Sequence, residues 1–344
     1  MKKVTLVLLL ASTLSACGGG GGGNPSAQTS TAPSVVPAVT SANLQLSVPT
    51  PTYGAGSPQL DAFTAINTYR QKLGLGLWAQ NAALDQASQA HAAYSLATTL
   101  PISPHLEDPS QPGFTGTTFD VRDLAAGYKG WAVSEVMGIG TGAPVIDRLM
   151  NTVYHRGVLM DQGATEAGIG MAYSANAGTY ANVIDFGYTK AQNNASDFLV
   201  VYPMDKQTGI FACMGHENPN PYPTSEAAYT AQFYAPGAAV RGYSCLGIAG
   251  LPSSNITIQV ASSKTLVVTS FTVTEAGQTT PLDAWVMENG VTFDGSALDP
   301  SWSVLTAKSP FKLNTTYNVA FIGSVNGSPL TKTWNFTTGA VEMP

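Results

Sequence analysis

Two histidines and one glutamate are the residues of this sequence best suited to chemistry. They are His105, Glu135 and His155, called here the His–Glu trio. The chain of 344 residues has only four His, so two of them on either side of one Glu in a helix-rich region indicate a site. Neutral imidazole binds Zn²⁺ through either ring nitrogen, and a carboxylate completes or orients such a site. Without a metal, Glu135 can hold a histidine as a general base.

Three interpretations of the His–Glu trio are open from the sequence. The first is a polar binding cleft in which His105 and His155 take up Zn²⁺ opportunistically. The second is a structural network, in which a buried carboxylate bridges two imidazoles. The third is a metal-dependent hydrolase of peptides or wall material that activates a bound water. The sequence carries neither the His-Glu-x-x-His helix of zinc proteases nor a supporting Gly-x-Ser-x-Gly motif, so we expect binding rather than catalysis.

Helices and a hairpin are predicted around the His–Glu trio. Apolar residues recur at helical spacing from Leu60 to Leu73, with Gly74 placed to end that helix. Further helices are predicted from about 81 to 96 and from Pro144 to about residue 154, with a loop over 101–130 between them. The runs 167–173 and 180–186 flank Asn176-Ala177-Gly178 and predict a β-hairpin. The predicted fold class is therefore α+β, with helices packed on an antiparallel sheet.

Three other groups of side chains in this region have simpler roles. His91 lies seven residues after Leu84 on one face of an Ala-rich helix, which predicts a packed, structural histidine. Trp78 is treated as core. Arg122, Tyr128 and Trp131 precede Glu135 and could form the rim of a site around it.

The same region carries a series of short motifs in a fixed order. They are Asn67-Thr68-Tyr69-Arg70, the loop residue His105, Ser134-Glu135-Val136, the segment from Leu149 to His155-Arg156, Gly168-Ile169-Gly170 and Phe186-Gly187. Over residues 57–190 this order resembles the bacterial type of the CAP superfamily. That superfamily covers cysteine-rich secretory proteins, insect venom antigens and plant pathogenesis-related proteins. The resemblance implies an α-β-α sandwich for these residues.

The resemblance also implies a cleft with a tetrad of two His and two Glu. The His–Glu trio matches three members of that tetrad. Where the second Glu usually stands, this chain has Asn151 and Thr152, and either Asp147 or Glu107 could substitute for it. Members of the superfamily act mostly by binding lipids, sterols or proteins, so the resemblance implies a lipid, peptide or envelope-protein ligand.

The N-terminus is predicted to be a lipoprotein signal peptide over residues 1–17. Lys2 and Lys3 precede a short apolar run, and Leu14-Ser15-Ala16-Cys17 resembles a bacterial lipobox. Acyl chains such as palmitate on Cys17 would anchor the protein to a membrane of the cell envelope. Gly18 after this cysteine favours the outer membrane in a bacterium with two membranes. The alternative is an ordinary secretory signal with a chance Cys.

Residues 18–56 are predicted to form a flexible tether, because Gly, Ser, Thr, Ala and Pro dominate them. A partly ordered strand at its end, near residues 44–48, is the alternative. With Cys17 lipidated, Cys213 and Cys245 remain, and an even number of Cys outside the cytoplasm predicts one disulfide between them. Two free buried thiols are the alternative.

Residues 197–339 are predicted to form an all-β, immunoglobulin-like (Ig-like) sandwich. Short alternating or β-branched runs are separated by turn residues such as Asn326-Gly327, and no helix-length pattern occurs. Residues from about 213 to 249 would be a loop insertion that carries the disulfide. His216 and Glu217 lie in this insertion, and one His beside one Glu is weak support for a metal.

Composition excludes one class of partner. The formal net charge is −6 and only 10% of residues are charged, with no basic run beyond the N-terminus. Binding to nucleic acid needs clustered Lys and Arg, so it is not expected. We therefore expect a lipid-anchored protein of the cell envelope, with a ligand-binding first domain and an Ig-like spacer or adhesion module. A metal-dependent hydrolase and a non-enzymatic scaffold are the alternatives.

Overall fold

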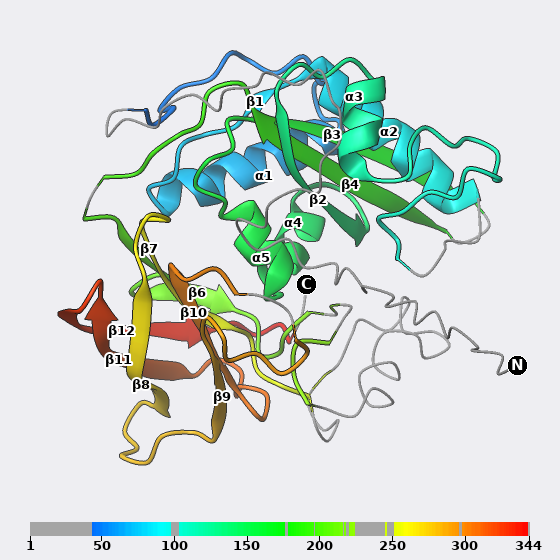
Figure 1. The fold of residues 1–344 in the computed structure, drawn as a ribbon. Coiled ribbons are helices and arrows are strands. Elements are labelled where there is room, and N and C mark those ends of the chain that lie inside the picture. The colour runs from blue at the N-terminus through cyan, green and yellow to red at the C-terminus, as the bar shows by residue number, and fades with distance from the viewer. Residues whose placement is uncertain are drawn as a thin grey trace, which may run out of the picture.

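The computed structural model describes most of the chain beyond residue 42. The described residues are 43–97, 103–175, 178–195, 197–215, 217, 220–223, 245, 251–295 and 298–342. They form an α/β unit, from α1 to β4, and a β-sandwich, from β5 to β12 (Figure 1). Cys17, His216 and most of the predicted tether lie outside the described residues. Within the described part, no helix is long and apolar enough to cross a membrane.

The α/β unit is a four-stranded sheet with helices on both faces. Its helices are α1 (Pro58–Lys72), α2 (Ala82–Ala97), α3 (Phe119–Ala125), α4 (Gly142–Met150) and α5 (Tyr154–Leu159). Its strands are β1 (Ala79–Gln80), β2 (Trp131–Ile139), β3 (Glu166–Ser174) and β4 (Thr179–Tyr188), in the order β1-β3-β4-β2. The α-β-α sandwich expected from the sequence is therefore present, and β3 and β4 form the predicted antiparallel hairpin.

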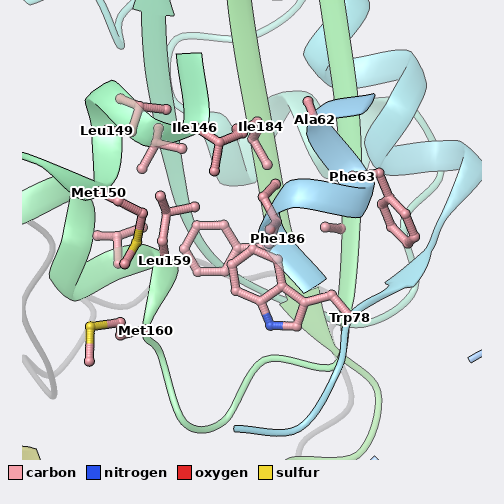
Figure 2. Packing of buried hydrophobic residues seen from close by; sticks show 14 of the residues in the cluster. Ala62, Phe63, Trp78, Ile146, Leu149, Met150, Leu159, Met160, Ile184 and Phe186 are labelled. Atoms are coloured by element: carbon pink, nitrogen blue, oxygen red, sulfur yellow. The ribbon is translucent and has the colours of Figure 1, made fainter. Parts of the chain in front are cut away.

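One face of this sheet carries the main apolar core. Side chains of α1, α4 and α5 pack there against β3 and β4, with Trp78 stacked on Phe186 at 4.8 Å between ring centroids (Figure 2). Arg70 lies over the Trp78 ring and donates to the carbonyl oxygens of Gly76, Leu159 and Asp161. The arginine of the first motif thus fixes loops of the α/β unit.

The other face of the sheet receives α2 at very short range. A Cβ atom on Gly168 would lie 2.0 Å from the backbone nitrogen of Asp85, and one on Gly170 would lie 2.1 Å from the carbonyl carbon of Ser88. Only glycine permits this backbone approach. The Gly-x-Gly motif therefore sets how deeply α2 brings Ser88 and His91 onto the sheet.

The β-sandwich has two four-stranded sheets that share one core. One sheet has the order β5-β7-β10-β9, and the other has the order β6-β12-β11-β8. Their bounds are β5 (Leu199–Tyr202), β6 (Gln207–Ile210), β7 (Ile256–Val260), β8 (Leu266–Glu275), β9 (Ala284–Met287), β10 (Trp302–Ala307), β11 (Thr316–Val325) and β12 (Ser328–Thr338). With β5, β7, β8, β9, β10, β11 and β12 taken as strands A to G, the orders are ABED and GFC, as in immunoglobulin constant domains. β6 adds to the second sheet, parallel to β12.

The α/β unit and the β-sandwich pack closely together. α4 and α5 lie on the side of the α/β unit that faces the sandwich (Figure 1). Arg156 of α5 is buried, donates to the carbonyl oxygen of Asn255 at 2.8 Å and lies over the Tyr202 ring. Gln162 donates to the carbonyl oxygen of Val260 at 2.8 Å. These contacts bury charged and amide groups between the two parts.

Two local predictions were incomplete. The helix expected from Pro144 to about residue 154 is two helices, α4 and α5, separated by residues 151–153. At the end of α4 the Asn151 amide donates to the carbonyl oxygen of Cys213, a bond over 62 positions that no local pattern reveals. The expected loop over 101–130 contains the short helix α3, and Glu135 lies within strand β2.

The segment 43–56, at the end of the predicted tether, lies against the α/β unit. The Gln45 side chain donates to the carbonyl oxygens of Leu77 and Thr165, and its backbone nitrogen donates to Gln192 at 2.8 Å. Tyr53 packs on Phe63 with 5.7 Å between ring centroids. The described end of this segment is thus fixed by specific contacts.

The close packing of the α/β unit on the β-sandwich predicts a stability effect at Gly157. A Cβ atom there would lie 2.7 and 2.8 Å from two ring atoms of Trp302 in β10. We expect Gly157→Ala to lower the free energy of unfolding by about 1–2 kcal/mol, because overpacking outweighs the gain in helix propensity. Urea denaturation measures this. Gly163→Ala is the control, since its Cβ would meet only an oxygen of Asp161 at 3.6 Å. Equal stability of the two variants would contradict this packing.

Candidate functional site

His105, Glu135 and Arg122 form the centre of the candidate site. Nδ1 of His105 lies 2.7 Å from Oε1 of Glu135, and the Arg122 guanidinium donates to Oε2 of Glu135 at 2.6 Å. The Glu135 and Arg122 side chains are almost completely buried, whereas 16% of the His105 side chain is exposed. The imidazole is therefore the member of this group that meets solvent, and the other two hold it in place.

The sheet and two helices bring these groups together. Glu135 on β2 lies opposite Asp185 on β4, so both carboxylates point to the face that α2 covers. Ser88 of α2 donates to Oδ2 of Asp185 at 2.7 Å. α3 packs on α2 and β2 and supplies Arg122. One face of the sheet is thus apolar, and the opposite face carries a buried layer of charged and polar groups.

A second histidine supports this layer from α2. Nδ1 of His91 lies 2.9 Å from Oε1 of Glu107, and Nε2 lies 3.0 Å from the carbonyl oxygen of Pro104. The other oxygen of Glu107 accepts from the backbone nitrogen of Thr115 at 2.6 Å. His91 is completely buried, so these contacts agree with the structural role expected for it. They fix the loop that carries His105.

Arg122 joins the two histidine–glutamate pairs. Besides Glu135, it donates to the carbonyl oxygens of His105 at 3.2 Å and Gly116 at 3.4 Å, and its Nε lies 3.9 Å from Oε1 of Glu107. The sequence placed Arg122 at the rim of the site, but it is buried at the centre. The sequence feature that could have indicated this role is the cluster of charged residues Asp120, Arg122 and Asp123, because charged residues are few in this chain.

Burial and charge shift the acidities in this layer in opposite directions. Burial alone would raise the pKa of Glu135, but the His105 hydrogen bond and the charges of His91, Arg122 and His105 hold it at about 2. Burial and the negative charge of Glu135 raise the pKa of Asp123 to about 8. Burial, Glu135 and Asp123 also raise the pKa of Asp185. Glu135 is therefore the ionised acid of the group at neutral pH.

His155 belongs to a separate pair at the start of α5. Its Nδ1 lies 3.0 Å from Oε1 of Glu217 and 3.0 Å from Oγ1 of Thr152. The Glu217 carboxylate accepts from the backbone nitrogens of Val153, Tyr154 and His155. The structure therefore pairs two members of the His–Glu trio with each other and pairs the third with Glu217, which the sequence had placed in the insertion. Nothing in the sequence connected Glu217 with His155.

The carboxylate and one ring nitrogen of the predicted zinc set already have other partners. Glu135 gives one oxygen to His105 and the other to the fixed cation of Arg122, which repels a second cation at the same carboxylate. Nδ1 of His155 is already used by Thr152 and Glu217. Across the described residues, no three or more His, Cys, Asp or Glu side chains are grouped to hold a metal ion. Zn²⁺ binding by His105 and His155 gains no support from this geometry.

Cys213 and Cys245 form a disulfide, as predicted, with 6.4 Å between their Cα atoms. Both residues are completely buried. The bridge lies in the region that joins the β-sandwich to α5, because Cys213 precedes Glu217 by four positions. It therefore fixes the start of the segment that reaches His155.

Comparison with known proteins identifies the α/β unit. Residues 63–186 match the model of the CAP family, described as the cysteine-rich secretory protein family. The chain therefore contains a CAP domain, as the order of its motifs indicated. An outer surface protein of Borrelia burgdorferi is similar over 38% of this chain and 90% of its own, with 18% identity and a TM-score of 0.30, which supports no further argument. No curated protein matches the chain.

The raised pKa of Asp123 predicts a pH effect on stability. An unfolded Asp ionises near pH 4, whereas folded Asp123 stays protonated up to about pH 8. Asp123 therefore makes its full contribution to the free energy of unfolding below about pH 4, and this contribution is lost as the pH rises through about 8. We expect Asp123→Asn to match the wild type at pH 4 and to be more stable at pH 8, on the order of a few kcal/mol.

Chemical denaturation at a series of pH values measures this effect. Asp108→Asn is the control, because Asp108 is only partly buried and hydrogen bonds from Ser110 lower its pKa. That variant should show no such gain. A stability difference between Asp123→Asn and wild type that stays constant from pH 4 to pH 8 would contradict the assignment.

Proposed function

We propose that this protein is an extracytoplasmic CAP protein that binds a ligand through His105. The observation that carries the proposal is the His105–Glu135–Arg122 group. A carboxylate on Nδ1 selects the neutral tautomer that carries its lone pair on Nε2, and it fixes the direction of the ring. A buried ion pair that orients one partly exposed ring suits recognition of a polar group on a ligand.

Catalysis has weaker support than binding. Glu135 is compensated by Arg122, which leaves it neither a free base nor a metal ligand. The hydrolase built on the His–Glu trio is therefore the less favoured function. The scaffold without a ligand remains the alternative that the binding experiment excludes or supports.

The proposed location combines the family with the N-terminal sequence. A secretory protein family and a disulfide support a compartment outside the cytoplasm. The lipobox at Cys17 supports a lipid anchor in the cell envelope, in the outer membrane where there are two. The β-sandwich, with its immunoglobulin-type strand order, would then be an Ig-like module of the envelope protein.

The binding function predicts a loss of ligand in His105→Phe. An aromatic ring is kept and both nitrogens are removed, so roughly a tenfold loss of affinity is expected for one hydrogen bond. Native mass spectrometry of the full chain, with an envelope lipid extract and a soluble peptidoglycan digest as separate probes, measures this. Lys129→Ala, at an exposed position outside the His105–Glu135–Arg122 group, is the control. If neither probe binds the wild type, or if both proteins bind alike, the proposal is wrong.

The lipid anchor predicts the behaviour of Cys17→Ala. Lipidation needs the thiol, so this variant should lose labelling by an alkyne analogue of palmitate and leave the membrane fraction. The Cys245→Ser variant controls for general effects of losing a cysteine and should stay labelled. A Cys17→Ala protein that still carries the label would contradict the anchor.

A further inference from the structure

The carboxylate of Glu217 is held at the start of α5 by several donors. Its Oε2 accepts from the backbone nitrogen of Val153 at 2.7 Å, and its Oε1 accepts from those of Tyr154 at 2.7 Å and His155 at 3.0 Å. The Glu217 side chain is almost completely buried. With both oxygens occupied by donors, the carboxylate faces the His155 ring as an acceptor.

The second neighbour of the ring is also an acceptor. The Thr152 hydroxyl donates its only proton to the carbonyl oxygen of Leu149 at 2.9 Å. Its oxygen can then only accept from Nδ1 of His155, 3.0 Å away. Because both neighbours of Nδ1 accept, Nδ1 must carry a proton. The neutral ring therefore keeps its lone pair on Nε2, and 19% of the side chain is exposed.

The segment that ends at Glu217 comes from the β-sandwich and is anchored on the CAP domain. The backbone nitrogen of Gly215 donates to the carbonyl oxygen of Asn151 at 3.0 Å, and the Asn151 amide donates to the carbonyl oxygen of Cys213 at 2.5 Å. A Cβ atom on Gly215 would lie 3.0 Å from a methyl group of Thr152, so the approach is close. The disulfide to Cys245 fixes the other side of this segment.

We propose that Glu217 is a positioning residue that makes His155 a second, solvent-facing hydrogen-bond acceptor. Asn151 binds the segment that brings Glu217, and Thr152 lies against Gly215 of that segment. The β-sandwich half thus supplies the carboxylate that faces His155. The class of ligand that fits is one with a hydroxyl or N–H donor, because Nε2 offers a lone pair backed by a negative charge.

Nitrogen NMR of the full chain labelled with ¹⁵N-histidine tests the pairing. At a pH where the ring is neutral, the wild type should show His155 with the proton on Nδ1 and the lone pair on Nε2. Glu217→Met removes the carboxylate and should produce a mixture of tautomers. Glu217→Gln should keep the wild-type tautomer. Its amide oxygen should take the Oε1 position, where three donors meet it, rather than the Oε2 position, where only one does. Nδ1 of His155 is one of the three donors and so keeps its proton.

Reactivity gives a second readout of the same atom. Nε2 of a neutral ring attacks diethyl pyrocarbonate, forms an N–C bond and releases ethanol and carbon dioxide. Peptide mapping should find carbethoxylated His155 in the wild type and in Glu217→Gln, with a loss of rate in Glu217→Met. A purely structural role for Glu217 would lower the melting temperature and leave both readouts unchanged.

Either of two results overturns the inference. One is a wild-type His155 with its proton on Nε2. This result is obtained on the wild type alone and so does not depend on whether a variant folds. The other is a Glu217→Met protein with the wild-type tautomer and reactivity. The inference deepens the proposed function and rests on it only for the ligand. Failure of ligand binding at His105 leaves the His155 tautomer unchanged, so the two failures are distinguishable.

Discussion

A carboxylate removed from water keeps its charge only if cations and hydrogen-bond donors replace the water. Glu135 is 5% exposed and lies on β2, an edge strand of the sheet, on the face that α2 and α3 cover. The compensation comes from Arg122 on one oxygen and His105 on the other. The positions of α3, of the loop before it and of His105 all follow from the need to surround this one charge.

The same need explains why the site is rigid. Arg122 cannot leave Glu135 without breaking its bonds to two backbone carbonyl oxygens, and the loop that carries His105 is tied to α2 through Glu107 and His91. The apolar face of the sheet, packed by α1 and α4, holds the strands on which these groups stand. Because its acids have pKa values pushed apart, the layer keeps Glu135 ionised while Asp123 holds a proton at neutral pH, and burial together with the charges of Glu135 and Asp123 raises the pKa of Asp185.

The adjacent residues His155 and Arg156 show how the two halves of the protein depend on each other. Arg156 reaches into the β-sandwich, and His155 receives Glu217 from it. The pKa of Arg156 is lowered to about 10 by burial, while Tyr202, Tyr222 and Glu217 from the sandwich half act against this shift. A sandwich joined to the CAP domain in this way forms part of the surroundings of His155.

Much of this structure could be predicted from the sequence, and the remaining features could not be predicted for physical reasons. Apolar spacing and turn residues predicted α1, α2, the β3–β4 hairpin and the all-β second half, because those patterns are local. The pairing of His105 with Glu135 was within reach, since few residues of either type occur. The break between α4 and α5 depends on a bond from Asn151 to Cys213. The position of Glu217 likewise depends on a contact across 62 positions, which residue order alone does not encode.

We propose that Glu135 orients His105 so that Nε2 accepts a hydrogen bond from a ligand. The most direct measurement is the tautomer of His105 in the full chain, read by long-range ¹H–¹⁵N NMR at a pH where the ring is neutral. We expect a proton on Nδ1 and a lone pair on Nε2 in the wild type. A double variant, Glu135→Leu with Arg122→Met, should lose this preference, and the second change avoids an unpaired buried cation. A wild-type ring protonated on Nε2 would contradict it.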